Sequence, residues 1–224
     1  MIAAESSPTF RWWERWGVLL GVLAVACWIV AFAVGGSSPD TGDSAAKITS
    51  FYAGHSHQVR QIVAWFIFLA GILLFLGFLA ALRGRLLAAE GGVGRLASLA
   101  HGAGLVSAAL WAVALSAFQA PAFLANDTRV ADLDPRAFKM FNDFGYELWV
   151  AAVMIGAILV WATSALAFRT ALLPRWFAWL GVVVGVVLLF GIFFIPAFVY
   201  WGWILVVAVM LALQGRAATP RAAV

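Results

Sequence analysis

Long apolar stretches, separated by short polar segments, dominate the pattern of residues along this chain. Each stretch approaches the ~20 residues that an α-helix needs to cross the hydrocarbon core of a bilayer. The stretches are continuous, whereas the strands of a membrane β-barrel alternate apolar and polar residues. The pattern therefore predicts six membrane-spanning helices, at about residues 16–34, 62–82, 96–118, 148–168, 176–195 and 198–213.

The last two of these helices share one apolar run, residues 176–213, which is too long for a single span. The run must fold back on itself, and Pro196 is the expected turn because proline interrupts a helix. The six helices then form three hairpins. We expect an all-α fold, a polytopic membrane helical bundle in which residues 1–224 form a single transmembrane domain.

Polar segments precede the second and fourth spans, with the sequences FYAGHSHQVRQ (51–61) and DPRAFKMFNDFGYEL (134–148). We expect both to belong to amphipathic helices that lie on the outer membrane surface and lead into a span. Asp43 is the expected cap of the first helix, and Asp134 with Pro135 is expected to begin the second. Pro121 is expected to open the polar loop before it.

Composition supports a membrane protein, because 65% of the residues are apolar and only 11% are charged. Soluble domains have about 45–50% and about 25%. The net charge of +4 does not indicate nucleic-acid binding, since the arginines stand singly at the ends of apolar runs. Arginine far outnumbers lysine, and alanine, glycine and valine are abundant, which indicates a bacterial protein. Tryptophans at span ends, Trp149 among them, are typical of anchors at the membrane interface.

The distribution of charge predicts the orientation. Cytoplasmic segments of membrane proteins carry an excess of Lys and Arg. In this chain the arginines gather in the two tails and in the loops after the second and fourth spans. Most of the acidic residues lie on the opposite side: Asp40, Asp43, Asp127, Asp132, Asp134, Asp143 and Glu147. We therefore expect both termini in the cytoplasm and the two long loops outside, in a bacterial inner membrane.

Small residues four apart predict close contacts between helices. Gly17 and Gly21, and likewise Gly181 and Gly185, have this spacing. It lets two membrane helices approach each other closely without a hydrophobic driving force.

Several segments resemble a family of uncharacterised bacterial multi-pass membrane proteins. They are the run LPRWFAWLG (173–181), the six spans and the segment DTGDSAAKITSFYAGHSHQVRQ (40–61) before the second span. The resemblance covers most of the chain. It implies a membrane fold without a known activity, so it supplies no site residues.

The histidines do not predict a metal or haem site. On a helix, His55 and His57 are separated by about 200°, with His55 on the packed face and His57 on the wet face. His101 lies near the opposite side of the membrane, so it cannot share a haem with either. It is better explained as a polar contact between packed helices. We expect neither a metal nor another cofactor.

The two polar segments contain the candidate binding residues. Asp143 and Glu147 share a helical face, but no nucleophile with an orienting base accompanies them. Glu147 adjoins the fourth span, where an unpaired charge is costly, so we expect it to pair with Arg60 or His57. The resulting outward-facing cup would bind a ligand through six residues: His57, Arg60, Gln61, Asp143, Tyr146 and Glu147.

The sequence favours a non-enzymatic function, either binding of a lipid-like molecule or service as a subunit of a membrane complex. The expected partners are membrane lipids, a lipid-like small molecule or another membrane subunit, and not nucleic acid. One alternative is a transporter of a small apolar solute. No span carries Lys, Arg or Asp near its middle, which argues against an ion-coupled transporter. The other alternative, a membrane enzyme, requires His57, Asp143, Tyr146 or Glu147 to converge in one pocket.

Overall fold

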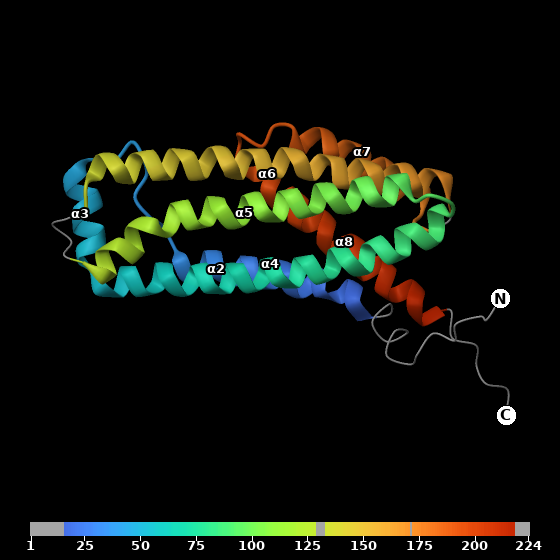
Figure 1. The fold of residues 1–224 in the computed structure, drawn as a ribbon, viewed down its shortest axis with the longest axis horizontal. Helices are drawn as coiled ribbons and strands as arrows, with labels where there is room; N and C mark the ends of the chain where they lie inside the picture. The colour runs from blue at the N-terminus through green and yellow to red at the C-terminus, as the bar shows by residue number, and fades with distance from the viewer. Residues whose placement is uncertain (1–15, 129–132, 171, 218–224) are drawn as a thin grey trace, which may run out of the picture.

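A computed structural model describes residues 16–128, 133–170 and 172–217, and these residues form helices, turns and loops without a strand (Figure 1). The predicted all-α fold is confirmed. A short 3-10 turn is followed by seven α-helices: η1 Gly17–Leu19, α2 Leu20–Gly35, α3 Ala45–Ala53, α4 His55–Glu90, α5 Arg95–Asp127, α6 Pro135–Arg169, α7 Arg175–Leu188 and α8 Ile195–Ala217.

Three of the helices are much longer than a bilayer requires. α4, α5 and α6 contain 36, 33 and 35 residues, which is about 50 Å each at 1.5 Å per residue. The hydrocarbon core is only about 30 Å thick. Five helical segments of the described chain are long and apolar enough to cross a membrane, whereas α7 has 14 residues and is too short.

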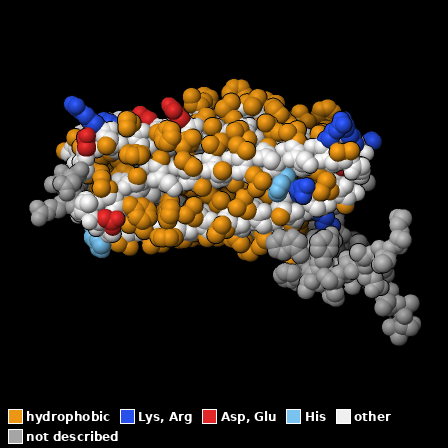
Figure 2. Space-filling model, in the orientation of Figure 1, with side chains coloured by type: hydrophobic (Ala, Val, Ile, Leu, Met, Phe, Trp, Pro, Cys, Tyr) orange, Lys and Arg blue, Asp and Glu red, His pale blue; other side chains and the backbone are white. Residues whose placement is uncertain are grey.

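The long helices run side by side along the molecule, and α3 lies across one end of them (Figure 1). We call this the α3 end, and the end with the α4–α5 and α6–α7 connections the loop end. Packing proceeds from α2 to α4, α5 and α6 in turn, while α8 packs between α2 and α6. On the face shown in Figure 2, apolar side chains cover the middle, and charged side chains gather toward the two ends.

Tryptophan and phenylalanine rings fill the centre of the bundle. Trp28 lies 5.1 Å from Trp111 and 5.4 Å from Trp201, measured between ring centroids. Trp149 lies 5.7 Å from Trp111 and is only 1% exposed. The prediction that Trp149 anchors the interface is therefore wrong, because its ring faces the other helices instead of the lipid.

Glycines allow two of the helices, α2 and α7, to approach their neighbours. A Cβ atom at Gly181 would lie 2.0 Å from the Ser164 hydroxyl of α6, and one at Gly185 would lie 2.0 Å from the Trp161 indole nitrogen. A Cβ at Gly21 would lie 2.8 Å from the Phe78 ring of α4. The small residues therefore lie where helices contact each other, as their spacing predicts.

The first polar segment differs from the prediction because Gly54 interrupts it. Gly54 has an extended backbone, so α3 ends at Ala53 and α4 begins at His55. Ser44, and not Asp43, caps α3 by accepting a hydrogen bond from the Lys47 N–H. Asp43 instead binds the Lys47 ammonium at 2.7 Å, and this contact is the first cause of its lowered pKa.

The second polar segment is not a separate surface helix, because it forms the first turns of α6 without a break. Its predicted start is correct: the Asp134 carboxylate accepts from the Arg136 N–H, and Pro135 occupies the first turn. Pro121 does not open a loop either. It is buried inside α5, which continues to Asp127 and bends toward α4 near the α3 end (Figure 1).

The turn between α7 and α8 spans residues 189–194, so the prediction of a turn at Pro196 is wrong. Pro196 belongs to the first turn of α8, where a missing N–H costs nothing. Successive N–H groups of Leu189, Phe190 and Gly191 bond to carbonyls three residues earlier. These bonds give three N–H groups of the turn a partner. The turn lies beside α6, about halfway along the bundle (Figure 1).

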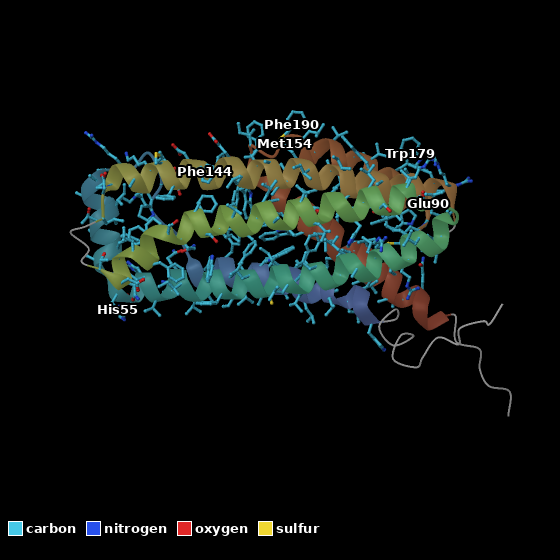
Figure 3. The ribbon with its side chains drawn as sticks, viewed as in Figure 1. His55, Glu90, Phe144, Met154, Trp179 and Phe190 are labelled. Atoms are coloured by element: carbon cyan, nitrogen blue, oxygen red, sulfur yellow. The ribbon has the colours of Figure 1, made fainter. Side chains whose placement is uncertain are left out.

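Several apolar side chains point away from the bundle and are exposed, as expected for surfaces that contact lipid. Phe144 and Met154 on α6, Trp179 on α7 and Phe190 in the turn are examples (Figure 3).

Candidate functional site

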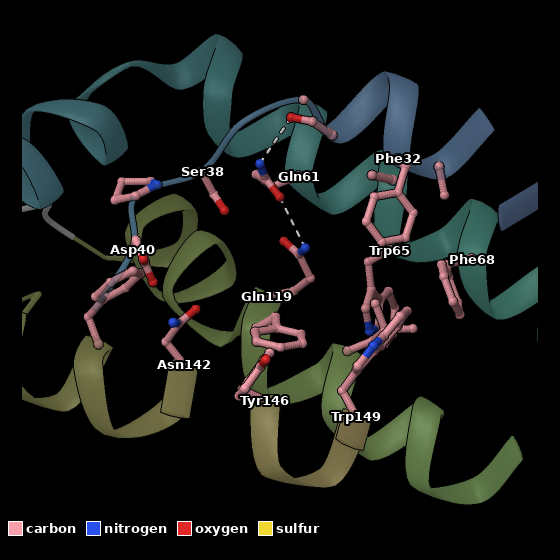
Figure 4. A pocket seen from close by; sticks show the side chains of 18 of the residues that line it. Phe32, Ser38, Asp40, Gln61, Trp65, Phe68, Gln119, Asn142, Tyr146 and Trp149 are labelled. Carbon is pink, nitrogen blue, oxygen red and sulfur yellow. Dashed lines mark hydrogen bonds between the residues drawn. The ribbon is translucent and has the colours of Figure 1, made fainter. Parts of the chain in front are cut away.

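A cavity of about 320 Å³ lies near the α3 end, between α2, α4, α5 and α6 (Figure 4). It exists because α2 stops at Gly35 while its neighbours continue. The chain after α2 crosses this space, so Gly36, Ser38, Pro39 and Asp40 line the cavity. α3 contributes Tyr52. Burial raises the pKa of Tyr52 to about 12, so this side chain is a neutral phenol near pH 7.

Two neighbouring residues of α4 bond to the C-terminus of α2. A helix ends with carbonyl groups that have no partner within the helix. Arg60 donates through Nε to the Val34 carbonyl at 3.0 Å, and Gln61 donates through Nε2 to the Gly35 carbonyl at 3.1 Å. These bonds fix where the cavity begins, and they place the Gln61 amide, which is 5% exposed, in its wall.

Gln119 of α5 extends this arrangement into a chain of amides (Figure 4). Its Nε2 donates to Gln61 Oε1 at 3.0 Å. The orientation of both amides follows from chemistry. A carbonyl oxygen only accepts, so Gln61 must turn its NH₂ group to Gly35 and its oxygen to Gln119. Gln119 Oε1 is thereby left buried, with no hydrogen-bond partner among the residues that the structure describes.

Polar residues of α6 tie the loop after α2 to the bundle. Asn142 donates through Nδ2 to the Thr41 hydroxyl at 2.8 Å, and that hydroxyl donates to the Asp143 carboxylate at 2.7 Å. Tyr146 donates through its hydroxyl to the Ile192 carbonyl in the α7–α8 turn. The polar residues of α6 are thus hydrogen-bonded to two irregular segments, the loop after α2 and the α7–α8 turn.

Aromatic side chains of α2, α6 and the α7–α8 turn form a second wall of the cavity. Phe194 stacks on Trp149 at 5.3 Å, and Phe32 lies 5.8 Å from Phe194. Phe32 also lies 6.1 Å from Trp149. The Trp149 indole N–H is buried and has no acceptor within the described chain. The cavity therefore combines a polar wall and an aromatic wall. It also has one buried acceptor without a donor, Gln119 Oε1, and one buried donor without an acceptor, the Trp149 indole N–H.

The structure brings together only part of the predicted cup. Gln61 and Tyr146 line the cavity. Arg60 and Asp143 do not line it. Their hydrogen bonds, to the Val34 carbonyl and the Thr41 hydroxyl, fix the end of α2 and the loop that follows. His57 lies outside, stacked on Phe51 at 4.4 Å and bonded to the Phe51 carbonyl at 3.0 Å. His55 is the exposed histidine and His57 is half-buried, so the predicted assignment of packed and wet faces is reversed. The reason is that Gly54 ends α3 before both histidines, and both belong to α4.

The predicted pairing of Glu147 is wrong. Glu147 is exposed, and within the described residues it forms no ion pair or hydrogen bond with Arg60 or His57. The reason is the continuity of α6. Asn142, Tyr146 and Trp149 are four and three residues apart and share one face toward the cavity. Glu147 is the next residue after Tyr146, so its side chain is rotated by about 100° around the helix axis and points away from that face.

Sequence reasoning missed Gln119, Asn142, Tyr52 and Phe32. Gln119 had a detectable signal, because it is an amide at the outer end of the third span, at the same depth as Gln61. Asn142 could have been found from its spacing to Tyr146. No comparable signal marked Phe32, which is one apolar residue among many.

No group of three or more His, Cys, Asp or Glu side chains gathers anywhere in the described ranges. Of the residues on which a membrane enzyme would depend, only Tyr146 lines the cavity, so the four do not converge.

The fold and the cavity define an α-helical membrane protein with a small amphiphilic pocket near one end of its bundle. The family described as domain of unknown function DUF4386 matches residues 16–218, and the chain belongs to this family. The chain matches no curated protein and no solved structure.

Proposed function

We propose that the protein binds an amphiphilic, lipid-like molecule in this cavity, without carrying out chemistry on it. The observation that carries the proposal is the division of the cavity into a polar and an aromatic wall. Its volume of about 320 Å³ is at the small end of ligand pockets, which run from about 300 to 1,000 Å³. This volume suits a headgroup and not a whole lipid.

The depth of the cavity fits such a ligand. Arg83 and Arg169 lie near the loop end, where a membrane interface is expected. Twenty residues of helix, or about 30 Å, lead from Arg83 to Val63 and from Arg169 to Trp149. Gln61 and Trp149 therefore lie at the opposite border of the hydrocarbon core. A ligand here would have its polar head among the headgroups.

The wall between α2 and α6 offers a place for the tail. α8 packs between these two helices but begins only at Ile195. Closer to the α3 end, side chains take its place, and two of them, Phe32 and Phe194, are 37% and 36% exposed. In a bilayer they would face acyl chains. An alkyl tail can therefore leave the cavity between α2 and α6, past these rings.

We also propose the orientation and the number of crossings. η1 and the end of α8 lie at the loop end, together with Arg83, Arg95 and Arg175, so the positive-inside rule puts the loop end in the cytoplasm. The six helices form three hairpins, and the third turns within the hydrocarbon because α7 is short. The cavity then faces the outside of a bacterial inner membrane.

Transport is less well supported than binding. A solute pathway needs polar groups that continue through the membrane, whereas the rings of Trp28, Trp111 and Trp201 fill the bundle below this cavity.

A cavity-filling substitution tests the proposal. Ala31 lines the cavity and is 4% exposed, whereas Ala33 lies on the same helix and faces outward. We expect the unmodified protein and Ala33→Phe to retain a lipid-like molecule through purification, and Ala31→Phe to lose it. Mass spectrometry of the extracted lipids measures this. Overpacking costs about 1–3 kcal/mol, so thermal unfolding confirms that both variants are folded. Equal lipid content in both variants would overturn the proposal.

A further inference from the structure

We propose that the cavity selects amphiphiles with an uncharged headgroup whose hydroxyl both donates and accepts a hydrogen bond, such as a glycerol or a single sugar. This inference rests on the proposed function. It names the class of ligand for the same site.

The need for a donor comes from Gln119. Its Oε1 is buried without a partner in the described chain, and its amide cannot turn around. Turning would bring its oxygen against Gln61 Oε1, which is fixed by the bond from Gln61 Nε2 to the Gly35 carbonyl. A buried acceptor without a donor is destabilising. A ligand that donates an O–H or N–H here therefore gains binding free energy that an acceptor-only ligand cannot gain.

The need for an acceptor comes from Trp149. Its indole N–H is equally buried and unpaired among the described residues, and its ring lines the same cavity. An indole only donates. A hydroxyl group satisfies both requirements, because one O–H donates while its oxygen lone pairs accept.

The charge of the residues that line the cavity determines which charge the ligand headgroup can carry. None of the described lining residues is Lys, Arg or His, and Asp40 is the only acidic residue among them. Arg60 is bonded to the Val34 carbonyl, and its guanidinium packs on Gly36. A carboxylate or phosphate head would therefore lose hydration without meeting a counter-charge, and it would also face Asp40. A quaternary ammonium head carries no N–H for Gln119, and a protonated amine has no lone pair with which to accept from the Trp149 indole. The uncharged hydroxyl head remains.

Three lipids with the same acyl chain separate these requirements. Monoolein has hydroxyls, methyl oleate is neutral but only accepts, and oleate at pH 8 is an anion. The purified full chain is held in an amine-oxide detergent, which has no hydroxyl groups, and bound lipid is counted by native mass spectrometry. We expect monoolein to bind about tenfold more tightly than methyl oleate, which corresponds to one buried hydrogen bond. Oleate should bind more weakly than either neutral lipid.

Gln119→Leu tests the assigned residue, and Asn126→Leu is the matched control, because Asn126 is an exposed amide on the same helix and does not line the cavity. We expect the ratio of monoolein to methyl oleate affinity to fall to about one in Gln119→Leu and to stay unchanged in Asn126→Leu. The ratio is measured in one preparation, so partial unfolding lowers both affinities and leaves it interpretable.

The outcomes distinguish this inference from the proposal on which it rests. Equal affinity for all three lipids, abolished by Ala31→Phe, would leave the cavity as a lipid site and overturn the headgroup selection. An unchanged preference for monoolein in Gln119→Leu would overturn the role of Gln119. Failure of every lipid to bind the unmodified protein would overturn the proposed function itself.

Discussion

At the scale of single residues, Gly181 lies where α7 contacts α6. A Cβ there would lie 2.0 Å from the Ser164 hydroxyl, whereas nothing lies within 4 Å of a Cβ at Gly102. We expect Gly181→Leu to destabilise the bundle by about 1–3 kcal/mol through overpacking. The control Gly102→Leu should be neutral or stabilising, because leucine favours a helix more than glycine does. Thermal unfolding in detergent measures both. Equal stability of the two variants would show that α7 does not depend on close contact with α6.

The difference between Gln61 and Glu147 shows what a sequence can reveal about the site. Gln61 can be predicted because it is a polar residue at the end of a span, where it must find a partner. Glu147 satisfies the same rule, which predicts that it pairs, but in the structure it is exposed. The rule gives a residue's depth in the membrane, whereas pairing depends on its direction around the helix. That direction requires the register of α6 relative to α4, which the sequence does not supply.

At the scale of elements, the existence of the helices could be predicted and their ends could not. A run of about 20 apolar residues indicates a span. The helices α4, α5 and α6 continue beyond these runs through polar turns whose only signal is an amphipathic pattern. The same pattern is typical of a surface helix. Gly54 separates such a helix from its span in one case, and no glycine does so at the start of α6. The sequence does not locate the α7–α8 turn either, because its six residues are as apolar as the helices on either side.

At the scale of the whole molecule, the proposed orientation places the α3 end outside and the loop end in the cytoplasm. The cavity, α3 and the loop after α2 would then all face the external surface. The basis is the distribution of charge, with arginines near the loop end and most acidic residues near the α3 end. Figure 2 shows the acidic side chains toward the α3 end on the face that it draws.

Cysteine labelling in whole cells tests this orientation. Cys27, the only cysteine, is first replaced by serine, and single cysteines are introduced as Gly42→Cys or Val93→Cys. Gly42 is exposed with open space around it, and Val93 is 82% exposed in the α4–α5 connection. We expect a membrane-impermeant maleimide to label Gly42→Cys in intact cells and Val93→Cys only after permeabilisation. The reverse pattern would place the cavity on the cytoplasmic side.

The central claim is that an amphiphile occupies the cavity, with its head at Gln119 and its tail between α2 and α6. An electron cryomicroscopy map of the protein in lipid nanodiscs tests it most directly. We predict elongated density whose head lies within hydrogen-bond distance of Gln119 Oε1 and whose tail passes between Phe32 and Phe194. A map with ordered water alone in the cavity, or with lipid only on the outer surfaces of the helices, would contradict the claim.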